Sequence, residues 1–127
     1  MPRIVFRSPL QEVAVEVPEG TTILDAAEKC GAQVGHSCGG VCGCSTCHVW
    51  VKKGLESLSE QEDMEIDRLD LAFDVKPNSR LACQAHVRGE DLDVWITEES
   101  LNAFMDENPD VRKALEAEGR WPPPKFA

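Results

Sequence analysis

The chain contains no tyrosine, few aromatic residues of any kind (6%), and no hydrophobic run that approaches membrane-spanning length. Because a transmembrane helix needs about 20 consecutive apolar residues, we expect no membrane-spanning segment. Residues 1–7 also lack a long apolar stretch and a small-residue cleavage site, so no export signal is expected. Together these absences predict a protein that stays in the cytoplasm.

Basic residues are scarce as well. The sequence holds 13 Lys and Arg against 23 Asp and Glu, which gives a formal net charge of -10 at pH 7. A protein of this charge repels nucleic acid and anionic membrane surfaces and attracts basic protein surfaces. The composition therefore argues against nucleic acid and membranes as ligands and favours a basic protein partner.

The chain is long enough for one folded core, with 127 residues of which 42% are hydrophobic. Both expected helices open on a capping-box pattern, Thr22 with Asp25 and Ser59 with Glu62. Strands are expected at residues 3–7, 13–17, 48–53 and 92–96, and helices at residues 22–30 and 59–73. This order predicts an α+β fold, a compact sheet with a helix across it.

The pattern changes near residue 98. Residues 102–118 are compatible with a short helix that ends at Gly119, and a proline-rich end follows. We assign residues 1–99 to the folded domain and residues 100–127 to a C-terminal extension that we expect to be loosely packed. The alternative is that this extension docks a partner through Trp121 and Phe126.

Six cysteines are present, and four of them lie between residues 38 and 47. In a cytoplasmic chain of this size, such clustering indicates metal binding rather than a disulfide framework. Cys38, Cys44, Cys47 and Cys83 form a C-x5-C-x2-C…C pattern. Thiolates are the soft ligands that an iron–sulfur cluster requires, so the pattern predicts a metal centre with four cysteine ligands.

Three glycines, Gly39, Gly40 and Gly43, lie within the cysteine segment. Residues without Cβ let the backbone approach an inorganic core and leave N–H groups able to bond to sulfur. Two tetrahedral irons that share two sulfides leave four positions, and four thiolates fill them all. A closed 2Fe-2S site has no position for substrate, so we expect an electron carrier and not an enzyme.

Several residues near the pattern allow other interpretations. Cys42 lies between these cysteines, and it could replace Cys38 or Cys44 as a ligand or act as a reactive thiol in cluster transfer. A structural zinc site is the alternative metal centre, although zinc sites usually pair cysteines two by two. His48 is predicted to support the cluster by a hydrogen bond, Arg80 to anchor its loop by a salt bridge, and Cys30 to be buried and inert.

Three stretches, residues 38–48, 67–73 and 79–84, resemble the adrenodoxin and putidaredoxin class of 2Fe-2S ferredoxins, and most of all the bacterial ferredoxins of iron–sulfur cluster assembly. The first cysteine interval is one residue longer than in plant-type ferredoxins. The resemblance covers about residues 1–97 and implies a β-grasp-like ferredoxin fold. It also implies that Cys38 and Cys44 hold one iron, that Cys47 and Cys83 hold the other, and that Cys42 is a non-ligating thiol.

Four aspartates, Asp63, Asp67, Asp70 and Asp74, recur at i, i+4, i+7 and i+11 of the second expected helix and so share one stripe. By the resemblance, Asp67 and Asp70 match the residues through which adrenodoxin-like proteins meet basic patches on their partners. We therefore predict that this stripe docks both the reductase and the acceptor. The apolar residues of this helix expected to face the core are Ile66, Leu69 and Phe73.

These observations predict a monomeric, bacterial one-electron carrier. It would pass electrons from a flavin-dependent ferredoxin reductase to iron–sulfur cluster assembly, where a cysteine desulfurase or scaffold is the acceptor. One alternative is an electron donor to a cytochrome P450 or another oxygenase. An alternative of another class is a redox-sensing or binding module whose cluster or zinc ion stabilises the fold.

Overall fold

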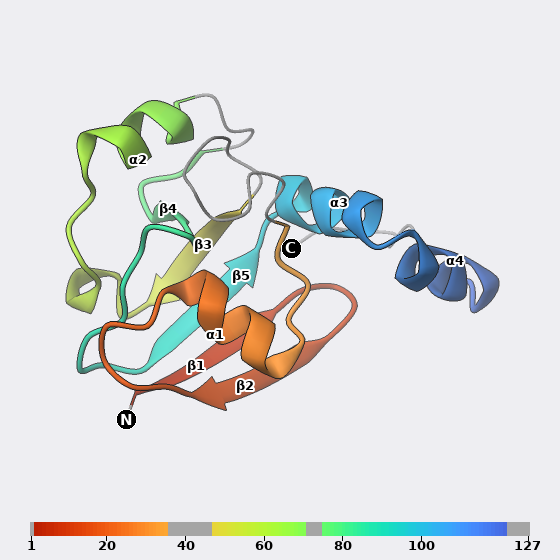
Figure 1. The fold of residues 1–127 in the computed structure, drawn as a ribbon, viewed down its shortest axis with the longest axis horizontal. Coiled ribbons are helices and arrows are strands. Elements are labelled where there is room, and N and C mark those ends of the chain that lie inside the picture. Colours follow the sequence, from red (N-terminus) through yellow and green to blue (C-terminus); the bar gives the residue numbers. More distant parts are fainter. Residues whose placement is uncertain (1, 36–46, 71–74, 122–127) are drawn as a thin grey trace.

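A five-stranded mixed sheet in the order β2-β1-β5-β3-β4 organises the chain (Figure 1). The computed structural model describes residues 2–35, 47–70 and 75–121. The strands are β1 Arg3–Arg7, β2 Glu12–Glu16, β3 His48–Lys53, β4 Ser79–Leu81 and β5 Leu92–Ile96. All neighbouring strands are antiparallel except β1 and β5, which pair in parallel. The predicted α+β class and opening hairpin are confirmed.

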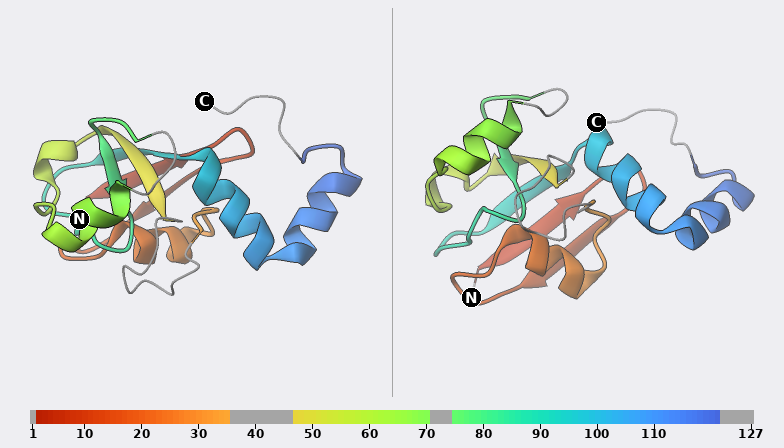
Figure 2. Two further views of the ribbon diagram at one scale, coloured as in Figure 1. Left: turned by 90° about the horizontal axis from the view of Figure 1, so that it is seen from above. Right: turned by 45° about the horizontal axis from the view of Figure 1, so that its top comes forward.

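The first helix follows its local signals closely. Helix α1 (Ile23–Cys30) is preceded by Thr22, whose hydroxyl accepts a hydrogen bond from the Asp25 N–H at 3.1 Å. Gly31 ends the helix at φ 74°, a left-handed conformation that favours glycine. Four apolar residues of α1 are buried in the core, and the helix lies across one face of the sheet (Figures 1 and 2).

The second helix begins later than predicted, at α2 (Asp63–Leu69), after the short 3-10 turn η1 (Leu55–Ser57). Its N-cap residue, Glu62, makes no side-chain capping bond, so the expected capping box at Ser59 is wrong. The reason is a competing partner, because the Ser59 hydroxyl accepts a hydrogen bond from the His86 N–H at 2.9 Å. The helix contacts β4 at the edge of the sheet.

Two helices follow β5, namely α3 (Glu98–Glu107) and α4 (Pro109–Ala117). Figure 2 shows that α3 follows the end of β5 and that α4 lies at an angle to α3, farther from the sheet. The main hydrophobic cluster includes Leu101, Met105 and Leu115 from these helices. The expectation of a loosely packed extension is therefore wrong where Leu101, Met105 and Leu115 pack, because these three side chains are buried with the core of the sheet.

The two long central strands carry a paired set of tryptophans. Trp50 on β3 lies opposite Trp95 on β5, and the Lys52 ammonium lies 5.5 and 6.0 Å from the two ring centroids. The Lys76 ammonium lies 4.9 Å from the Trp50 ring. Cations at these distances are attracted by the aromatic faces.

None of the helices among the described residues is both long and apolar enough to span a membrane.

Candidate metal centre

Two cysteines from distant parts of the sequence are brought together at one end of the sheet. Cys47 directly precedes β3 and Cys83 follows β4, and these strands pair antiparallel with His48 opposite Leu81. The Ala82 N–H donates to the Cys47 carbonyl oxygen at 3.0 Å, so Cys83 follows the residue bonded to Cys47. Both cysteines are buried, with 0% and 7% of their surface exposed. Sulfur ligands in a shielded position suit an iron–sulfur cluster.

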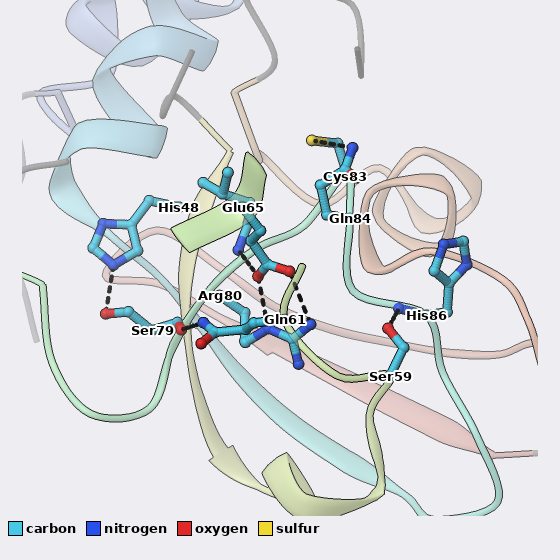
Figure 3. A network of polar contacts seen from close by, with 10 residues as sticks. His48, Ser59, Gln61, Glu65, Ser79, Arg80, Cys83, Gln84 and His86 are labelled. Atoms are coloured by element: carbon cyan, nitrogen blue, oxygen red, sulfur yellow. Dashed lines mark hydrogen bonds and ion pairs between the residues drawn. The ribbon is translucent and has the colours of Figure 1, made fainter. Parts of the chain in front are cut away.

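A side-chain amide lies next to one of these sulfur atoms. Gln84 Nε2 donates a hydrogen bond to Cys83 Sγ at 3.5 Å (Figure 3). Hydrogen bonds to ligand sulfurs are one means by which proteins set the potential of a cluster. Sequence reasoning did not identify Gln84, although its position directly after the last cysteine of the pattern was an available signal.

The rest of the predicted cysteine segment lies outside the described residues. This set comprises Cys38, Gly39, Gly40, Cys42, Gly43 and Cys44. Within the described ranges, no three Cys, His, Asp or Glu side chains gather closely enough to hold a metal ion. A four-thiolate centre built on Cys47 and Cys83 therefore requires two further thiolates, and residues 36–46, which precede Cys47, offer three.

His48 adjoins Cys47 and is held from two sides. Its Nε2 atom lies 2.7 Å from Ser79 Oγ in a buried contact (Figure 3). Its backbone carbonyl accepts a hydrogen bond from Thr97 Oγ1 at 2.7 Å. The imidazole is fully buried. These contacts fix the residue that follows Cys47, and the predicted support of a cluster by His48 stays a prediction.

Arg80 forms a buried ion pair with Glu65, as the predicted salt bridge requires. Its Nε and Nη2 atoms donate to Glu65 Oε2 and Oε1 at 2.6 and 3.0 Å (Figure 3). The Leu81 N–H donates to the same carboxylate at 3.0 Å. Only 1% of Glu65 and 4% of Arg80 is exposed. The pair therefore joins α2 to the strand that leads to Cys83.

Glu65 is a site-supporting residue that sequence reasoning missed. It counts among the many acids of this region, and nothing in its residue type distinguishes it from its exposed neighbours. A positional signal was available, because Glu65 and the buried Leu69 are four residues apart and share one face of α2. A carboxylate on a core-facing position needs a buried cation as partner, which Arg80 supplies.

The opposite side of α2 is acidic and exposed. Asp63, Asp67 and Asp70 are all exposed, and Asp74 lies outside the described residues. Ile66 is 43% exposed, so its expected place in the core is wrong. The reason is the orientation of the helix: Glu65 and Leu69 are buried, and Ile66 lies between the aspartates at i+3 from Asp63.

Cys30 is half-buried at the end of α1, which corrects the expectation that it is buried. Its thiol lies 3.6 Å from the Ala27 carbonyl oxygen, within hydrogen-bond range for sulfur. Burial raises the pKa of the Cys30 thiol and so disfavours the reactive thiolate. The prediction that Cys30 is chemically inert is compatible with this shift.

Residues 8–88 match a protein-family model described as a 2Fe-2S iron–sulfur cluster binding domain. Among curated proteins, a 2Fe-2S ferredoxin of Escherichia coli strain K12 is 43% identical over 107 residues, which are 80% of this chain and 96% of that protein. The match thus extends over nearly the whole length of that relative.

Solved structures with the same arrangement of elements are also ferredoxins. One is an ISC-like 2Fe-2S ferredoxin, FdxB, from Pseudomonas putida, with a TM-score of 0.71 and 40% identity over 80% of this chain and 97% of that chain. Another is the covalent complex of putidaredoxin reductase with putidaredoxin, with a TM-score of 0.61, 26% identity, and coverage of 74% and 96%.

Proposed function

This chain belongs to the 2Fe-2S ferredoxins, and from that membership we propose that it passes single electrons from a flavin-dependent reductase to iron–sulfur cluster assembly. The family consists of electron carriers and binds one 2Fe-2S cluster, which supplies one-electron redox chemistry. The observation that carries the proposal is the convergence of two buried cysteines, Cys47 and Cys83, at one end of β3 and β4.

We assign four ligands to the cluster: Cys38, Cys44, Cys47 and Cys83. The two described members are buried and adjacent, and the other two have the C-x5-C-x2-C spacing with Cys47. Cys42 is proposed as a non-ligating thiol. Gly39, Gly40 and Gly43 are proposed to let the backbone approach the cluster, and His48 and Arg80 to hold the flanking strands. Four thiolates leave no open iron position, so the role is electron transfer and not catalysis on a substrate.

The exposed acidic side of α2 is the proposed docking surface for both partners. Ile66, an apolar side chain that is 43% exposed, lies three residues after Asp63 and four before Asp70, next to the exposed aspartates Asp63, Asp67 and Asp70. An apolar centre with a charged rim is the usual composition of a transient protein interface. Asp74 is proposed as a further member of this surface. Electrostatic attraction to a basic partner favours rapid and salt-sensitive association, which a shuttling carrier requires.

The partners are proposed from the relatives. The putidaredoxin complex with its reductase supports a flavin-dependent ferredoxin reductase as the electron source. The likeness to the ISC-like ferredoxin of Pseudomonas putida supports a cysteine desulfurase or scaffold of cluster assembly as the acceptor. We further propose a monomer located in the bacterial cytoplasm, with residues 1–99 as the ferredoxin-type domain and residues 100–127 as its C-terminal extension.

The test is capture of partners by the cluster-loaded protein in anaerobic lysate of its own organism at low salt. Wild type is compared with Asp67→Asn/Asp70→Asn, and captured proteins are identified by mass spectrometry. We expect a cysteine desulfurase or its scaffold with the wild type and its loss with the variant. Capture of a cytochrome P450 or another oxygenase in its place would contradict the assembly role and leave the electron-carrier function standing.

A matched charge control is available at the far edge of the sheet. Glu16 on β2 and Glu19 beyond it are exposed, and β2 lies at the opposite edge from β4 and α2. Glu16→Gln/Glu19→Gln also removes two negative charges, but from a different surface. If this control loses the partner as completely as the α2 variant, net charge explains the binding and the proposed docking surface is wrong.

A further inference from the structure

The first turn of α3 is hydrogen-bonded to the residues on both sides of segment 36–47. The Gly35 N–H donates to Ser100 Oγ at 2.9 Å in a buried contact. The Ser100 N–H donates to Thr97 Oγ1 at 3.2 Å, and Thr97 Oγ1 donates to the His48 carbonyl oxygen at 2.7 Å. A continuous chain of hydrogen bonds therefore runs from Gly35 to His48 through the N-cap of α3.

Backbone and helix also touch directly at Gly35. A Cβ at this position would lie 2.6 Å from Ala103 Cβ and 2.6 Å from the Ser100 carbonyl oxygen. Real Cβ atoms do not approach other atoms so closely, so only glycine permits this packing. Figure 1 shows α3 beginning where β5 ends, beside the chain that leaves α1.

The second flank has a side-chain contact in addition to its backbone bond. The Glu99 Oε1 atom lies 3.8 Å from Nδ1 of the fully buried His48. Thr97 and Ser100 are buried as well, with 2% and 0% of their surface exposed. Hydrogen bonds shielded from water in this way resist competition from solvent, so they suit a rigid connection.

We propose that the first turn of α3 clamps the cluster-binding segment by fixing both of its flanks, and that Ser100 is a positioning residue for the cluster. The inference rests on the proposed function, because three of the four assigned ligands, Cys38, Cys44 and Cys47, lie between Gly35 and His48. Under this proposal the helix after β5 is part of the metal centre, although it contributes no ligand.

Two properties of the bound cluster follow from the clamp. Three assigned ligands lie between the two clamped residues, so a weaker attachment of Gly35 and His48 should speed release of the cluster. A weaker attachment should also admit water to the cluster, which stabilises the reduced form with its additional negative charge and raises the reduction potential. Loss of one buried hydrogen bond of ~1.4 kcal/mol corresponds to about a tenfold change in an equilibrium constant.

The experiment measures cluster release and potential in the full-length, cluster-loaded protein. Release is followed as bleaching of the cluster absorbance after addition of excess chelator under anaerobic conditions, and potential by spectroelectrochemistry. Ser100→Ala removes the acceptor for the Gly35 N–H, and we expect release to be about tenfold faster with a higher potential. Gly35→Ala forces the two backbones apart, and its effect should be at least as large.

Two control variants separate a clamp from general stability. Asn102→Ala changes an exposed residue of the same helix and should behave as wild type. Leu115→Ala removes a buried side chain of α4 and lowers stability without touching Gly35 or His48. Urea unfolding gives the loss of stability in each variant, so that release rates and potentials can be compared between variants that are equally destabilised. If Ser100→Ala matches Leu115→Ala in release rate and keeps the wild-type potential, the clamp does not exist.

An error in the assignment of the cysteine ligands would be distinguished from an error in the clamp by a separate measurement. Acid-labile sulfide and iron are measured on the wild type and on Cys38→Ser and Cys44→Ser. A full cluster in both cysteine variants would overturn the assignment of these ligands and, with it, the basis of the clamp. Cluster loss in these variants, with wild-type release and potential in Ser100→Ala and Gly35→Ala, would overturn the clamp alone.

Discussion

The Glu65 carboxylate accepts two hydrogen bonds from the Arg80 guanidinium, at 2.6 and 3.0 Å, inside the protein core. The carboxylate accepts a third hydrogen bond from the Leu81 N–H. The pair joins the helix that carries the exposed aspartates to the strand that leads to Cys83. It is thus a direct mechanical connection between the proposed docking surface and the proposed metal centre.

Removal of one partner of this pair should be strongly destabilising. Glu65→Ala leaves the Arg80 charge and the Leu81 N–H buried without their acceptor, and the expected loss is about 3–5 kcal/mol of unfolding free energy. The measurement is urea unfolding of the cluster-loaded protein, followed by circular dichroism. A loss below about 1 kcal/mol would show that water or another group replaces the carboxylate.

A double replacement should cost less than the single one. Glu65→Leu/Arg80→Met removes both charges together, so no unpaired ion remains in the core. We expect its stability to lie above that of Glu65→Ala in the same unfolding assay. Asp67→Ala, on the exposed side of the same helix, serves as the control and should unfold as the wild type does.

Reduction by the flavin-dependent reductase should depend on the α2 aspartates in a salt-sensitive manner. Asp67→Lys/Asp70→Lys reverses two exposed charges, and we expect kcat/KM for reduction to fall by about tenfold or more at low ionic strength. The deficit should shrink at high salt, because exposed charges are screened beyond ~3 Å at 1 M. An equal deficit at both salt concentrations would argue against electrostatic steering.

Leu101 tests whether α3 belongs to the folded core. Its side chain is fully buried in the main hydrophobic cluster, so Leu101→Ala should destabilise the protein by about 2–5 kcal/mol. Thermal unfolding of the cluster-loaded protein is the measurement. Val111→Ala, at a partly exposed position of α4, should have a much smaller effect. Comparable effects of the two substitutions would mean that α3 is peripheral in solution.

Cys30 should be a slow thiol with a shifted pH profile. Burial raises its pKa, so at any given pH less thiolate is present than in an unfolded peptide. Alkylation of the Cys30-containing peptide by iodoacetamide, quantified by mass spectrometry across pH, should have its midpoint above that of the denatured protein. A coincident midpoint in folded and denatured protein would contradict the effect of burial.

The same shift has a consequence for stability. A raised pKa means that the folded state holds the thiol proton more tightly than the unfolded state does. The contribution of the Cys30 thiol to the unfolding free energy is therefore fully present below the ordinary thiol pKa of about 8.5, and it is lost as pH rises through the raised pKa. Unfolding free energy should fall less steeply at alkaline pH in Cys30→Ser than in the wild type, when both are measured over the same pH range.

Elements with local signals were predictable from sequence. Thr22 and Gly31 cap α1 through residues only a few positions away, and both ends of that helix agree with prediction within one residue. The cysteine spacing likewise predicted the family that the comparisons show. In both cases the decisive interactions lie within a short stretch of chain.

Long-range partners account for what was missed. Ser59 does not cap α2 because the His86 N–H, distant in sequence, occupies its hydroxyl. Glu65 on α2 is buried only because Arg80 on β4 supplies a cation to pair with it. The packing of α3 had a usable signal, since Leu101 and Met105 are four residues apart, but polar neighbours outnumber them in that helix. Such contacts depend on the assembled fold, which no local pattern specifies.

The parallel pairing of β1 with β5 also determines when this chain completes its fold. Residues 4–7 of the first strand find their partners only at residues 92–95, so the sheet closes late in synthesis on the ribosome. Contacts of such long sequence separation slow folding because a large loop must be ordered first. The cysteines at positions 38–47 are therefore translated before β5 is available to complete the sheet.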